Sequence, residues 1–596
     1  MKSTVFSNAS ETQSISPFWW LLTFVVAVAL WSVDIARPVD LPGWHEIDYS
    51  SIARNFLREG NNILYPRIDW RGDGPGFTEM EFPIIPWLMA QLYRVFGIHE
   101  IIGRIFSLVF MLASLGVFSR LALKLLPGTA ALVATLAFVI SHEITIVSTA
   151  IQPESLMLLC YLSAVYCFVD WYESKKPASY AMAVLSFAAA VLVKSPAAHL
   201  AIFFLIWALI KDGLSSFRKP SLYLFAALSF APALLWYVHA SSLWHQFHNS
   251  MGVSNEDHWL GIDLLERPKV IANLVIIDLV FIFGGGGVLV VLASLLRSKL
   301  TSAVNRLALT WCVAVAIYLI VILRTSSGHW AAYYHVVAVP PIALLFGAGV
   351  NQLRVHTIPW RRAALLVAAP ALLISASLYW LSNSDYSHMP GVIQDLAIAR
   401  SSVLVLAVLI LISFSVTVLC INIGKLPHNG TTTMSAPLAS SFVVIGCFTY
   451  FLLSSQLLLG TWQTYETRTP QYDAASAFAN KMSSNSLIVA TGGICLDSSG
   501  HRVAQDAPNM FYWLDRKGFT TCTGHQSIAE LQSFAKRGAE YFIADKDSLT
   551  EQPSLESDLR HSFLLRAESK AAFLFDLTAT PPSRVVLEKS SYSRPH

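Results

Sequence analysis

Residues 38–97 read PVDLPGWHEIDYSSIARNFLREGNNILYPRIDWRGDGPGFTEMEFPIIPWLMAQLYRVFG and connect two long apolar windows, at 18–36 and 101–122. Each window is long enough to cross a bilayer, so the hydrophilic segment between them is predicted to be a loop on one side of a membrane. The composition agrees. Of 596 residues, 54% are hydrophobic and only 13% are charged, against about 25% charged in ordinary globular proteins. Lipid must therefore be the main solvent of this chain.

Further apolar windows predict an α-helical polytopic membrane protein with about thirteen transmembrane helices. The first window lacks a small-residue cleavage site, which indicates an anchor and not a signal peptide. The windows lie at 18–36, 101–122, 128–142, 154–172, 179–193, 196–212, 221–238, 270–296, 306–323, 333–350, 363–381, 402–423 and 437–460.

The distribution of Lys and Arg in short loops predicts the orientation. Loops after even-numbered windows are rich in them, whereas loops after odd-numbered windows carry fewer. The amino terminus is therefore predicted to be cytoplasmic and the carboxyl-terminal segment extracytoplasmic. The basic residues in short loops after odd-numbered windows are Lys194, Arg267, Lys269, Arg324 and Arg400.

The carboxyl-terminal segment has the composition of a soluble domain. We predict a transmembrane domain over 1–460, which includes the outer loop 37–100 with interfacial helices, and a small extracytoplasmic α/β domain over 461–596. Within the latter, 470–482 and 526–538 have helical patterns, and 487–490 and 541–544 have the pattern of short buried strands. Cys495 and Cys522 lie in this segment, where an oxidising compartment allows a disulfide; two unpaired thiols remain the alternative.

Polar residues concentrate in the loops that follow odd-numbered windows. In the first of these loops, Glu79 and Glu81 directly precede an apolar segment, and a carboxylate at lipid depth is costly without a cationic partner or a metal. Each residue also has an ordinary interpretation, such as a snorkelling Lys194 or aromatic-belt tyrosines. Taken together, carboxylates, histidines and cations are predicted to converge on the outer face. The residues are Glu46, Asp48, Glu81, Glu154, Lys194, His258, Arg324, His329, Tyr333 and Tyr334.

The order of these motifs resembles the GT-C superfamily of membrane glycosyltransferases. The resemblance is greatest to bacterial relatives of protein O-mannosyltransferases and of the lipid A aminoarabinose transferase. It covers the first 350 residues, and the stretch 45–110 is its most specific part. The matching motifs are HEIDYSSIARNF at 45–56, YPRIDWRG at 65–72, EMEFPIIPWLMAQLYRVFG at 79–97, GRIFSLVF at 103–110, QPESLM at 152–157, LVKSP at 192–196 and HWAAYYHVVAVPP at 329–341.

The resemblance implies a catalytic acidic residue in the first outer loop. The DxxxIARNF spacing places this base at Asp48. The spacing of the aminoarabinose transferase instead falls on His45 and Glu46, of which only the glutamate is acidic, so Glu46 is the second candidate.

The resemblance also implies a glutamate that helps to hold a divalent metal ion or the acceptor, and this matches Glu81. Two departures from the family pattern affect the site. The lysine that often follows this glutamate is Phe82, so Lys194 or Arg324 would have to contact the lipid phosphate instead. His258 matches a histidine of a later outer-loop motif, but the arginine expected three residues on is Gly261.

These features predict an inverting glycosyltransferase that moves one sugar from a polyprenyl-phosphate donor to an envelope acceptor, either a lipid, a glycan or a protein. An outward-facing site has no access to nucleotide sugars, so the donor must be attached to lipid. Asp48 or Glu46 would be the base. Lys194, Arg324, His329, Tyr333, Tyr334 and Glu154 would bind the substrate or its phosphate, and Glu81 and His258 would hold a metal.

The expected partners are the donor, the acceptor and the lipid bilayer of a bacterial cytoplasmic membrane. No nucleotide cofactor is expected, and the formal net charge of +3 is too small to indicate nucleic acid. Two other functions remain open. A transporter would place ionisable residues at the bilayer midplane and show repeats, which the sequence lacks. A polysaccharide polymerase or ligase would use a similar lipid substrate, but the loop 45–97 does not have its pattern.

Overall fold

The computed structural model covers the whole chain, and the part that it describes comprises residues 15–33, 35–39, 44–252, 261–278, 291, 302–327, 329–355, 469–492 and 508–580. The chain divides into two compact units. The helical unit takes in Met1–Pro38, Met80–Ser242 and Val253–Glu466. The second unit is assembled from Val39–Glu79, Leu243–Gly252 and Thr467–His596. The first outer loop thus clusters with the carboxyl-terminal segment. The predicted domain boundary at 460/461 lies outside the described residues and stays a prediction.

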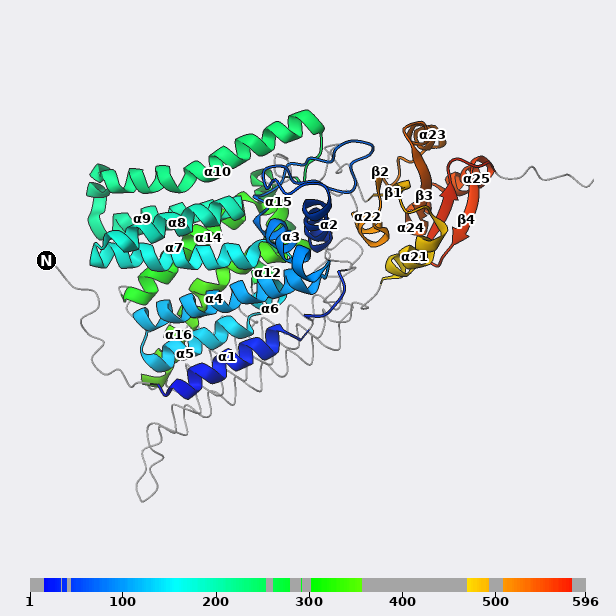
Figure 1. Cartoon of the computed structure of the whole chain (residues 1–596). Coiled ribbons are helices and arrows are strands. Elements are labelled where there is room, and N and C mark those ends of the chain that lie inside the picture. Colours follow the sequence, from blue (N-terminus) through cyan, green and yellow to red (C-terminus); the bar gives the residue numbers. More distant parts are fainter. Residues whose placement is uncertain are drawn as a thin grey trace, which may run out of the picture. The chain divides into compact units, whose positions relative to one another are not determined.

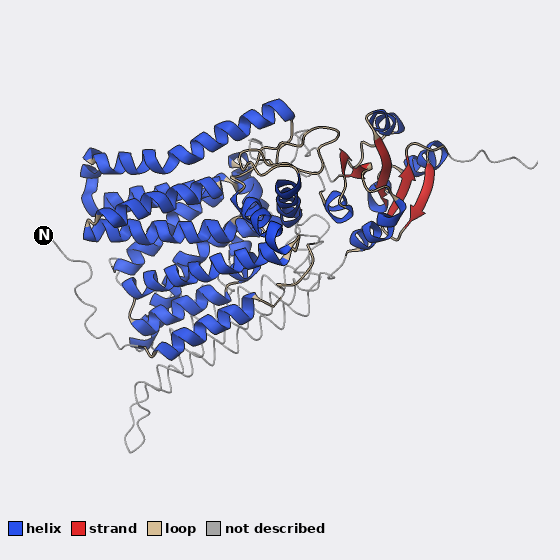
Figure 2. Cartoon of the chain, viewed as in Figure 1, coloured by secondary structure: helices blue, strands red, loops and turns tan. Residues whose placement is uncertain are grey.

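The helical unit is built from long apolar helices that run side by side (Figures 1 and 2). Its elements are α1 (Pro17–Trp31), α3 (Ile84–Phe96), α4 (Ile101–Leu125), α5 (Gly128–Ile140), α6 (His142–Val147), α7 (Glu154–Ser174), α8 (Pro177–Val193), η1 (Ser195–His199), α9 (Leu200–Asp212), η2 (Gly213–Arg218), α10 (Pro220–Phe247, whose last turn belongs to the second unit), η3 (Ile262–Glu266), α12 (Pro268–Ile277), α14 (Ala303–Val321), α15 (Leu323–Ser326), η5 (His329–Ala338) and α16 (Val339–Val355).

Six helical segments of the described residues are long and apolar enough to cross a membrane, so the chain is a multi-pass membrane protein. They are Ile101–Leu125, Glu154–Ser174, Ser195–Arg218, Pro220–Phe247, Ala303–Val321 and Tyr333–Asn351. Shorter apolar helices occupy Pro17–Trp31, Gly128–Ile140 and Pro177–Val193. The predicted windows from 18 to 238 therefore all coincide with helices. The window 270–296 is described only in part, and those from 363 to 460 lie outside the described residues, so thirteen helices remain a prediction.

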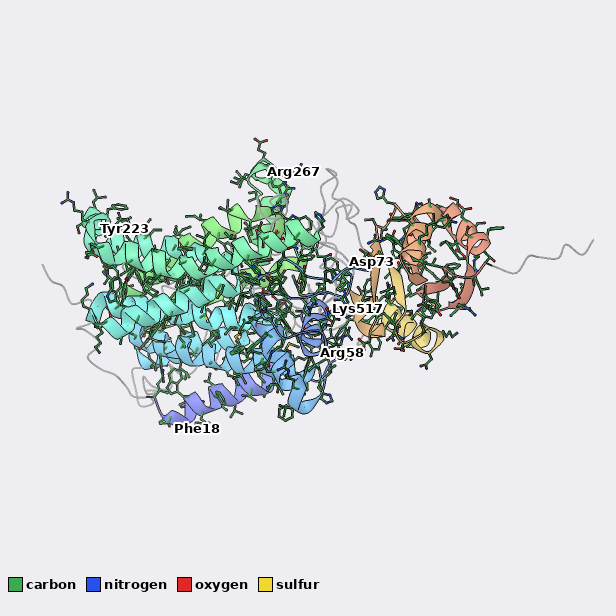
Figure 3. All side chains as sticks on the ribbon, turned by 45° about the horizontal axis from the view of Figure 1, so that its top comes forward. Phe18, Arg58, Asp73, Tyr223, Arg267 and Lys517 are labelled. Carbon is green, nitrogen blue, oxygen red and sulfur yellow. The ribbon has the colours of Figure 1, made fainter. Side chains whose placement is uncertain are left out.

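The outer surface of these helices is apolar, as a lipid-facing surface must be. Phe18 on α1 and Tyr223 on α10 are 60% and 59% exposed, and Figure 3 shows both side chains pointing away from the bundle. Leu234 and Leu235 on α10 are exposed as well. The interior is packed with aromatic residues: the tilted rings of Phe168 and Phe204 lie 4.2 Å apart between centroids. Lipid and packing together account for the scarcity of charge.

The second unit contains a five-stranded mixed sheet of order β2-β1-β3-β5-β4. Strands β1 and β2 and strands β1 and β3 are parallel, and β5 is antiparallel to both β3 and β4. Its elements are α2 (Trp44–Arg58), α21 (Pro470–Phe478), η7 (Ala479–Lys481), β1 (Leu487–Thr491), α22 (Asn509–Leu514), β2 (Lys517–Thr521), α23 (Ile528–Lys536), β3 (Ala539–Asp545), α24 (Lys546–Leu549), α25 (Pro553–Ser562), β4 (Leu564–Glu568) and β5 (Ala572–Asp576).

The helices and strands expected near 470–482, 487–490, 526–538 and 541–544 are present in this unit. Their patterns were readable because the strand interiors, such as Val489 and Phe542, are fully buried. Cys522 is disulfide-bonded. Cys495 lies outside the described residues, so its pairing with Cys522 stays a prediction.

Helix α2 differs from the expected interfacial helix with one apolar side. Residues 46–56 are buried throughout, polar side chains included. A polar group can be buried at low cost only when it is hydrogen-bonded, and Asp48, Arg54 and Asn55 all have such partners. The sequence pattern indicated the apolar side of the helix, but it did not indicate that the polar side is buried as well.

Candidate functional site

Lys194 lies at the break between two helices of the helical unit. Helix α8 ends at Val193, the Lys194 backbone is extended (φ −152°, ψ 110°), and the 3-10 turn η1 starts at Ser195 with Pro196 in its first turn. Proline stabilises the first turn of a helix and disfavours a helical conformation in the residue before it. The KSP sequence therefore ends α8 and turns the lysine side chain out of the helical row.

The Lys194 ammonium contacts residues from three other parts of this unit. It forms a hydrogen-bonded ion pair with Glu154, the first residue of α7. Its Nζ also lies 3.8 Å from Glu81 Oε1, just before α3. The ring centroids of Tyr333 and Tyr334 in η5 are 5.0 and 4.9 Å from the same nitrogen. Five residues that the sequence singled out are thus brought together, and we call them the Lys194 cluster.

Burial makes this cluster unusual. Lys194 is 3% exposed, Glu154 1% and Glu81 8%. Moving an isolated charge out of water costs several kcal/mol even after the protein relaxes, so a buried ammonium persists only beside a carboxylate. The Tyr faces add cation–π attraction, which is stronger where water is excluded. The arrangement holds one positive charge in a fixed place at the end of the bundle.

A hydrogen-bonded chain below the cluster holds the Lys194 turn. His199 Nδ1 lies 2.7 Å from the Pro196 carbonyl oxygen, which can only accept, so Nδ1 carries the proton. His199 Nε2 is hydrogen-bonded to the Tyr161 hydroxyl at 2.9 Å, and the Tyr161 oxygen accepts from Trp311 Nε1 at 2.7 Å. Through these hydrogen bonds, α7 and α14 are both tied to the turn that carries Lys194.

A small cavity of about 10 Å³ adjoins the cluster. It is large enough for about one water molecule and too small for a phosphate group. Its lining combines the cluster with the supporting chain and apolar residues: Glu154, Met157, Lys194, Pro196, Ala197, His199, Tyr318, Tyr333, Tyr334 and Val337.

Arg324 in α15 lies outside the Lys194 cluster as defined by these contacts. Its Nη2 donates to both carboxylate oxygens of Asp263, at 3.0 and 2.9 Å, and this pair is partly exposed. The backbone explains why residue 261 is glycine. A Cβ there would lie 2.3 Å from the Arg324 backbone nitrogen. The side chain expected at 261 has no room, and the α15 turn with Arg324 occupies that place.

Phe82, where the family pattern often has lysine, has a packing role. Its ring meets the Trp236 ring edge-on at a centroid distance of 5.1 Å, and Trp236 Nε1 donates to the Met80 carbonyl oxygen at 3.1 Å. These contacts fix the backbone on both sides of Glu81 against α10. Residue 82 therefore supplies a packing contact where the family pattern often has a positive charge.

In the second unit, Asp48 is buried on helix α2, at 1% exposure. Its Oδ1 accepts a hydrogen bond from Trp70 Nε1 at 3.0 Å. Glu46, the second candidate base, is also buried, in the first turn of the same helix. Glu46 and Asp48 are two positions apart, which corresponds to a rotation of about 200° around the helix axis. The two carboxyl groups therefore project in different directions, and Asp48 is the one that Trp70 orients.

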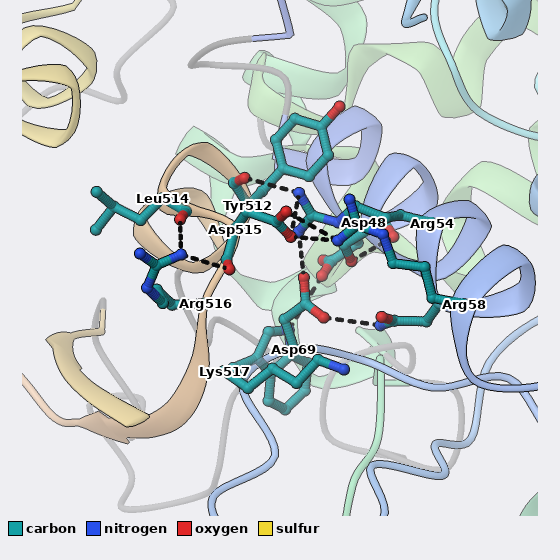
Figure 4. A network of polar contacts seen from close by, with 12 residues as sticks. Asp48, Arg54, Arg58, Asp69, Tyr512, Leu514, Asp515, Arg516 and Lys517 are labelled. Carbon is teal, nitrogen blue, oxygen red and sulfur yellow. Dashed lines mark hydrogen bonds and ion pairs between the residues drawn. The ribbon is translucent and has the colours of Figure 1, made fainter. Parts of the chain in front are cut away.

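The polar side of α2 continues in an ion-pair network around Asp69 (Figure 4). Asp69 accepts from Arg54 Nη2 and Asn55 Nδ2, each at 2.7 Å. Arg54 also lies 3.0 Å from Asp515 and donates to the Tyr512 carbonyl oxygen at 3.1 Å. Burial alone would lower the pKa of Arg54, but Asp69 and Asp515 raise it above its usual value, so the guanidinium stays charged.

The metal-binding role predicted for Glu81 and His258 finds no support in the described residues. They contain no group of three His, Cys, Asp or Glu side chains that could hold a metal ion. Glu81 is instead close to the ammonium of Lys194, which repels a cation. His258 lies outside the described residues, as does the side chain of His329. We therefore derive no chemical step through a metal.

Several residues of these two sites were not recognised in the sequence. They include Tyr161, His199 and Trp311 in the helical unit and Arg54, Asp69 and Trp70 in the second unit. Signals existed for some: a buried Trp or Tyr needs a hydrogen-bond partner, and an Asp-Trp pair in a Gly-rich loop is distinctive. None of these signals identifies the partner, which in the second unit lies up to 458 residues away.

The chain is similar in sequence profile and in fold to known proteins. Residues 75–237 match the sequence profile of the family described as dolichyl-phosphate-mannose-protein mannosyltransferase. No curated protein matches the chain significantly. Among solved structures, ArnT from Cupriavidus metallidurans bound to undecaprenyl phosphate is similar with a TM-score of 0.59 and 14% identity, over 95% of this chain and 100% of that chain.

Two further structures are similar. ArnT from Cupriavidus metallidurans in the apo state has a TM-score of 0.57 and 15% identity, over 95% of this chain and 99% of that chain. The archaeal oligosaccharyltransferase AglB from Archaeoglobus fulgidus, in complex with an inhibitory peptide and a dolichol-phosphate, has a TM-score of 0.47 and 13% identity, over 92% and 72%.

Proposed function

We propose that this chain, which has the GT-C glycosyltransferase fold, is an inverting enzyme that transfers one sugar from a polyprenyl-phosphate donor to an acceptor hydroxyl of the cell envelope. The resemblance to the GT-C superfamily that its sequence predicts is confirmed by the family profile and the fold. The step from fold to reaction is our proposal, because one fold can host several activities.

The buried Lys194 cluster is the observation that carries this proposal. A membrane protein gains no stability from burying an ammonium between two glutamates, because apolar residues of the same volume pack as well or better. Such a group is retained where its charge is needed. A lipid-linked sugar presents a phosphate at this depth, and an ammonium is a natural partner for it.

The phosphate requires more positive charge than Lys194 supplies. Lys194 is close to two carboxylates, Glu81 and Glu154, so the three side chains together are not cationic. Arg324 is the second candidate cation for binding the phosphate. Its side chain is 34% exposed and that of its partner Asp263 is 60% exposed, so solvent and ligands can reach the pair. We propose that Arg324 exchanges Asp263 for the phosphate, while Glu154 keeps Lys194 in place and Tyr333 and Tyr334 cover the phosphate.

Asp48 is the proposed base. In a single displacement, Asp48 accepts the proton of the acceptor hydroxyl as its oxygen bonds to the anomeric carbon, and the bond from that carbon to the phosphate oxygen breaks. The bonding electrons leave with the polyprenyl phosphate, whose charge Lys194 and Arg324 stabilise. The anomeric configuration is inverted because the oxygen attacks opposite the leaving group.

The donor class is supported by the ligand of one structural relative, since ArnT was solved with undecaprenyl phosphate. We further propose that the Lys194 end of the helices faces the outside of a bacterial cytoplasmic membrane. The amino terminus would then be cytoplasmic and the carboxyl-terminal segment extracytoplasmic, as the basic loops predict. The acceptor could be a lipid, a glycan or a protein.

The proposal is tested by supplying membranes that contain the protein with a panel of radiolabelled polyprenyl-phosphate sugars. We expect one label to move onto an acceptor in a new glycosidic bond. The variant Asp48→Asn should reduce transfer by at least about 100-fold, the lower end of the contribution of a general base. Glu46→Gln should retain more activity than Asp48→Asn.

Asp73→Asn is the matched control, because Asp73 lies in the same loop and pairs on the surface with Arg537. It should leave the transfer rate close to wild type. Full activity of a folded Asp48→Asn protein would exclude Asp48 as the base. Label that crosses vesicles without forming a new glycosidic bond would show a transporter and overturn the enzyme.

A further inference from the structure

We propose that Trp70 is a positioning residue for Asp48, and that the carboxyl-terminal sheet holds Trp70 in place, so that this segment controls the base without touching a substrate. This inference rests on the proposed function, in which Asp48 accepts the proton. All the contacts that carry it lie within the second unit.

The first step is the hydrogen bond from Trp70 to Asp48. Trp70 Nε1 donates to Asp48 Oδ1 at 3.0 Å, and the two residues are 9% and 1% exposed. An indole has one donor on a rigid ring, so the direction of this bond is set by the ring. Hydrogen bonds to an ionised group are stronger than neutral ones. Trp70 thus fixes the orientation of the carboxyl group and favours its ionised form.

The second step is the attachment of the Trp70 backbone to strand β2. Gly518 N donates to the Asp69 carbonyl oxygen at 3.2 Å, and Gly72 N donates to the Gly518 carbonyl oxygen at 2.6 Å. Trp70 therefore lies between two backbone hydrogen bonds to one residue of the sheet's edge strand. Gly518 has φ +152°, and a Cβ there would lie 1.8 Å from the Ile488 carbonyl oxygen. Only glycine allows β2 to pair this closely with β1 at the residue that also binds the Trp70 loop.

The third step is the link from the same loop to helix α2. The Asp69 carboxylate is held by Arg54 and Asn55, and Asn55 lies seven residues after Asp48, on the same side of the helix. Arg54 and Arg58 are in turn paired with Asp515, which follows α22. Figure 4 shows Arg54, Arg58 and Asp69 close to Asp515 of the carboxyl-terminal segment. The helix with Asp48 and the loop with Trp70 are thus fixed to one scaffold.

The test compares two Trp→Phe variants of the full chain in membranes. Trp70→Phe keeps an aromatic ring and removes the donor to Asp48. Trp513→Phe is the matched control, because Trp513 Nε1 donates in the same unit to the Val39 carbonyl oxygen at 2.9 Å. Transfer is measured as kcat/KM against pH, with the labelled polyprenyl-phosphate sugar that the panel experiment selects as donor.

For Trp70→Phe we expect kcat/KM to fall about tenfold, the size of one hydrogen bond to a charged group. The acidic limb of its pH profile should move to higher pH by about one pH unit, because the ionised carboxylate has lost a donor. Trp513→Phe should keep the wild-type limb even if it is less stable.

An unchanged acidic limb in an active Trp70→Phe protein would overturn the inference, since a merely structural role lowers the rate without moving the limb. An equal shift in Trp513→Phe would overturn it as well. These results differ from a failure of the proposed function. If Asp48→Asn is inactive but Trp70→Phe has the wild-type profile, only the positioning role fails; if Asp48→Asn is fully active, the assigned base fails.

Discussion

Helix α7 carries an ion pair near each end, and the two pairs differ in burial. At its first residue, Glu154 pairs with Lys194, and the side chains are 1% and 4% exposed. About 24 Å along the helix axis, Asp170 and Glu173 pair with Lys124 at 2.7 and 3.2 Å, and all three side chains are between 21% and 28% exposed. One end buries its charges, whereas the other leaves them accessible.

The difference in burial distinguishes charges that set the orientation of the protein in the membrane from a charge that is proposed to bind the leaving phosphate. Partly exposed cations at the Lys124 end agree with the basic loops that predict the cytoplasmic side. Lysines there also spread over aromatic rings, as Lys175 does over Tyr172 at 4.4 Å. Partly exposed ion pairs such as those of Lys124 contribute little to the free energy of unfolding. At the Lys194 end, desolvation makes each partner depend on the other, so single substitutions should have unequal effects at the two ends.

The largest effect is expected for Lys194→Met. This change leaves Glu154 buried without its cation, and breaking a buried ion pair costs about 3–5 kcal/mol. Thermal unfolding in detergent should occur at clearly lower temperature, and sugar transfer should be lost. Both are measured on the same purified sample, so that activity is expressed per folded protein.

The double variant Lys194→Met/Glu154→Gln distinguishes stability from function. It removes both charges of the hydrogen-bonded pair and leaves only the more distant and more exposed Glu81, so most of the lost thermal stability should return. Transfer should remain absent, because the cation for the leaving phosphate is still missing. If the double variant regained activity together with stability, the Lys194 cluster would be only structural.

A smaller effect is expected for Tyr161→Phe. The hydroxyl that it removes lies between His199 Nε2 and Trp311 Nε1, and each buried group left without a partner costs roughly 1–3 kcal/mol. We expect reduced stability and a several-fold loss of transfer, since the turn before His199 carries Lys194. The control is Tyr180→Phe near the other end of α8, where the hydroxyl bonds the Ser221 carbonyl oxygen at 2.9 Å. Equal losses of transfer in both variants would contradict a special role for the Tyr161 chain.

The residues of the Lys194 cluster could be predicted from the sequence, whereas the hydrogen-bonded chain that holds the Lys194 turn could not. Glu81, Glu154, Lys194, Tyr333 and Tyr334 were recognised because charges and paired tyrosines stand out in an apolar chain, and loop alternation placed them at one end of the bundle. The roles of these residues stay predictions until they are tested. The supporting chain was missed because Tyr161, His199 and Trp311 look like ordinary apolar-helix residues, and only the packing of α7, η1 and α14 brings them together.

The second unit shows the limit of prediction more clearly. Helical and strand patterns near 470–545 were readable, but their association with residues 39–79 was not. That association depends on the register of β2 against the loop at 69–72 and on ion pairs such as Arg58–Asp515. Contacts between residues more than 400 positions apart leave no local pattern in a single sequence. Asp48 was therefore identified without Trp70, the group that orients it.

The smallest effect is expected for Lys124→Met, the counterpart of Lys194→Met at the opposite end of α7. Asp170 would keep its bond from Ser179 Oγ at 2.6 Å, and water can solvate both carboxylates because they are partly exposed. The loss should be about 0.2–1 kcal/mol and should shrink further at high salt, which screens exposed charges. Transfer should stay within about twofold of wild type, as for a surface substitution away from the site. A loss of transfer comparable to that of Lys194→Met would mean that burial does not distinguish the two ends, and the functional assignment of the Lys194 cluster would lose its physical basis.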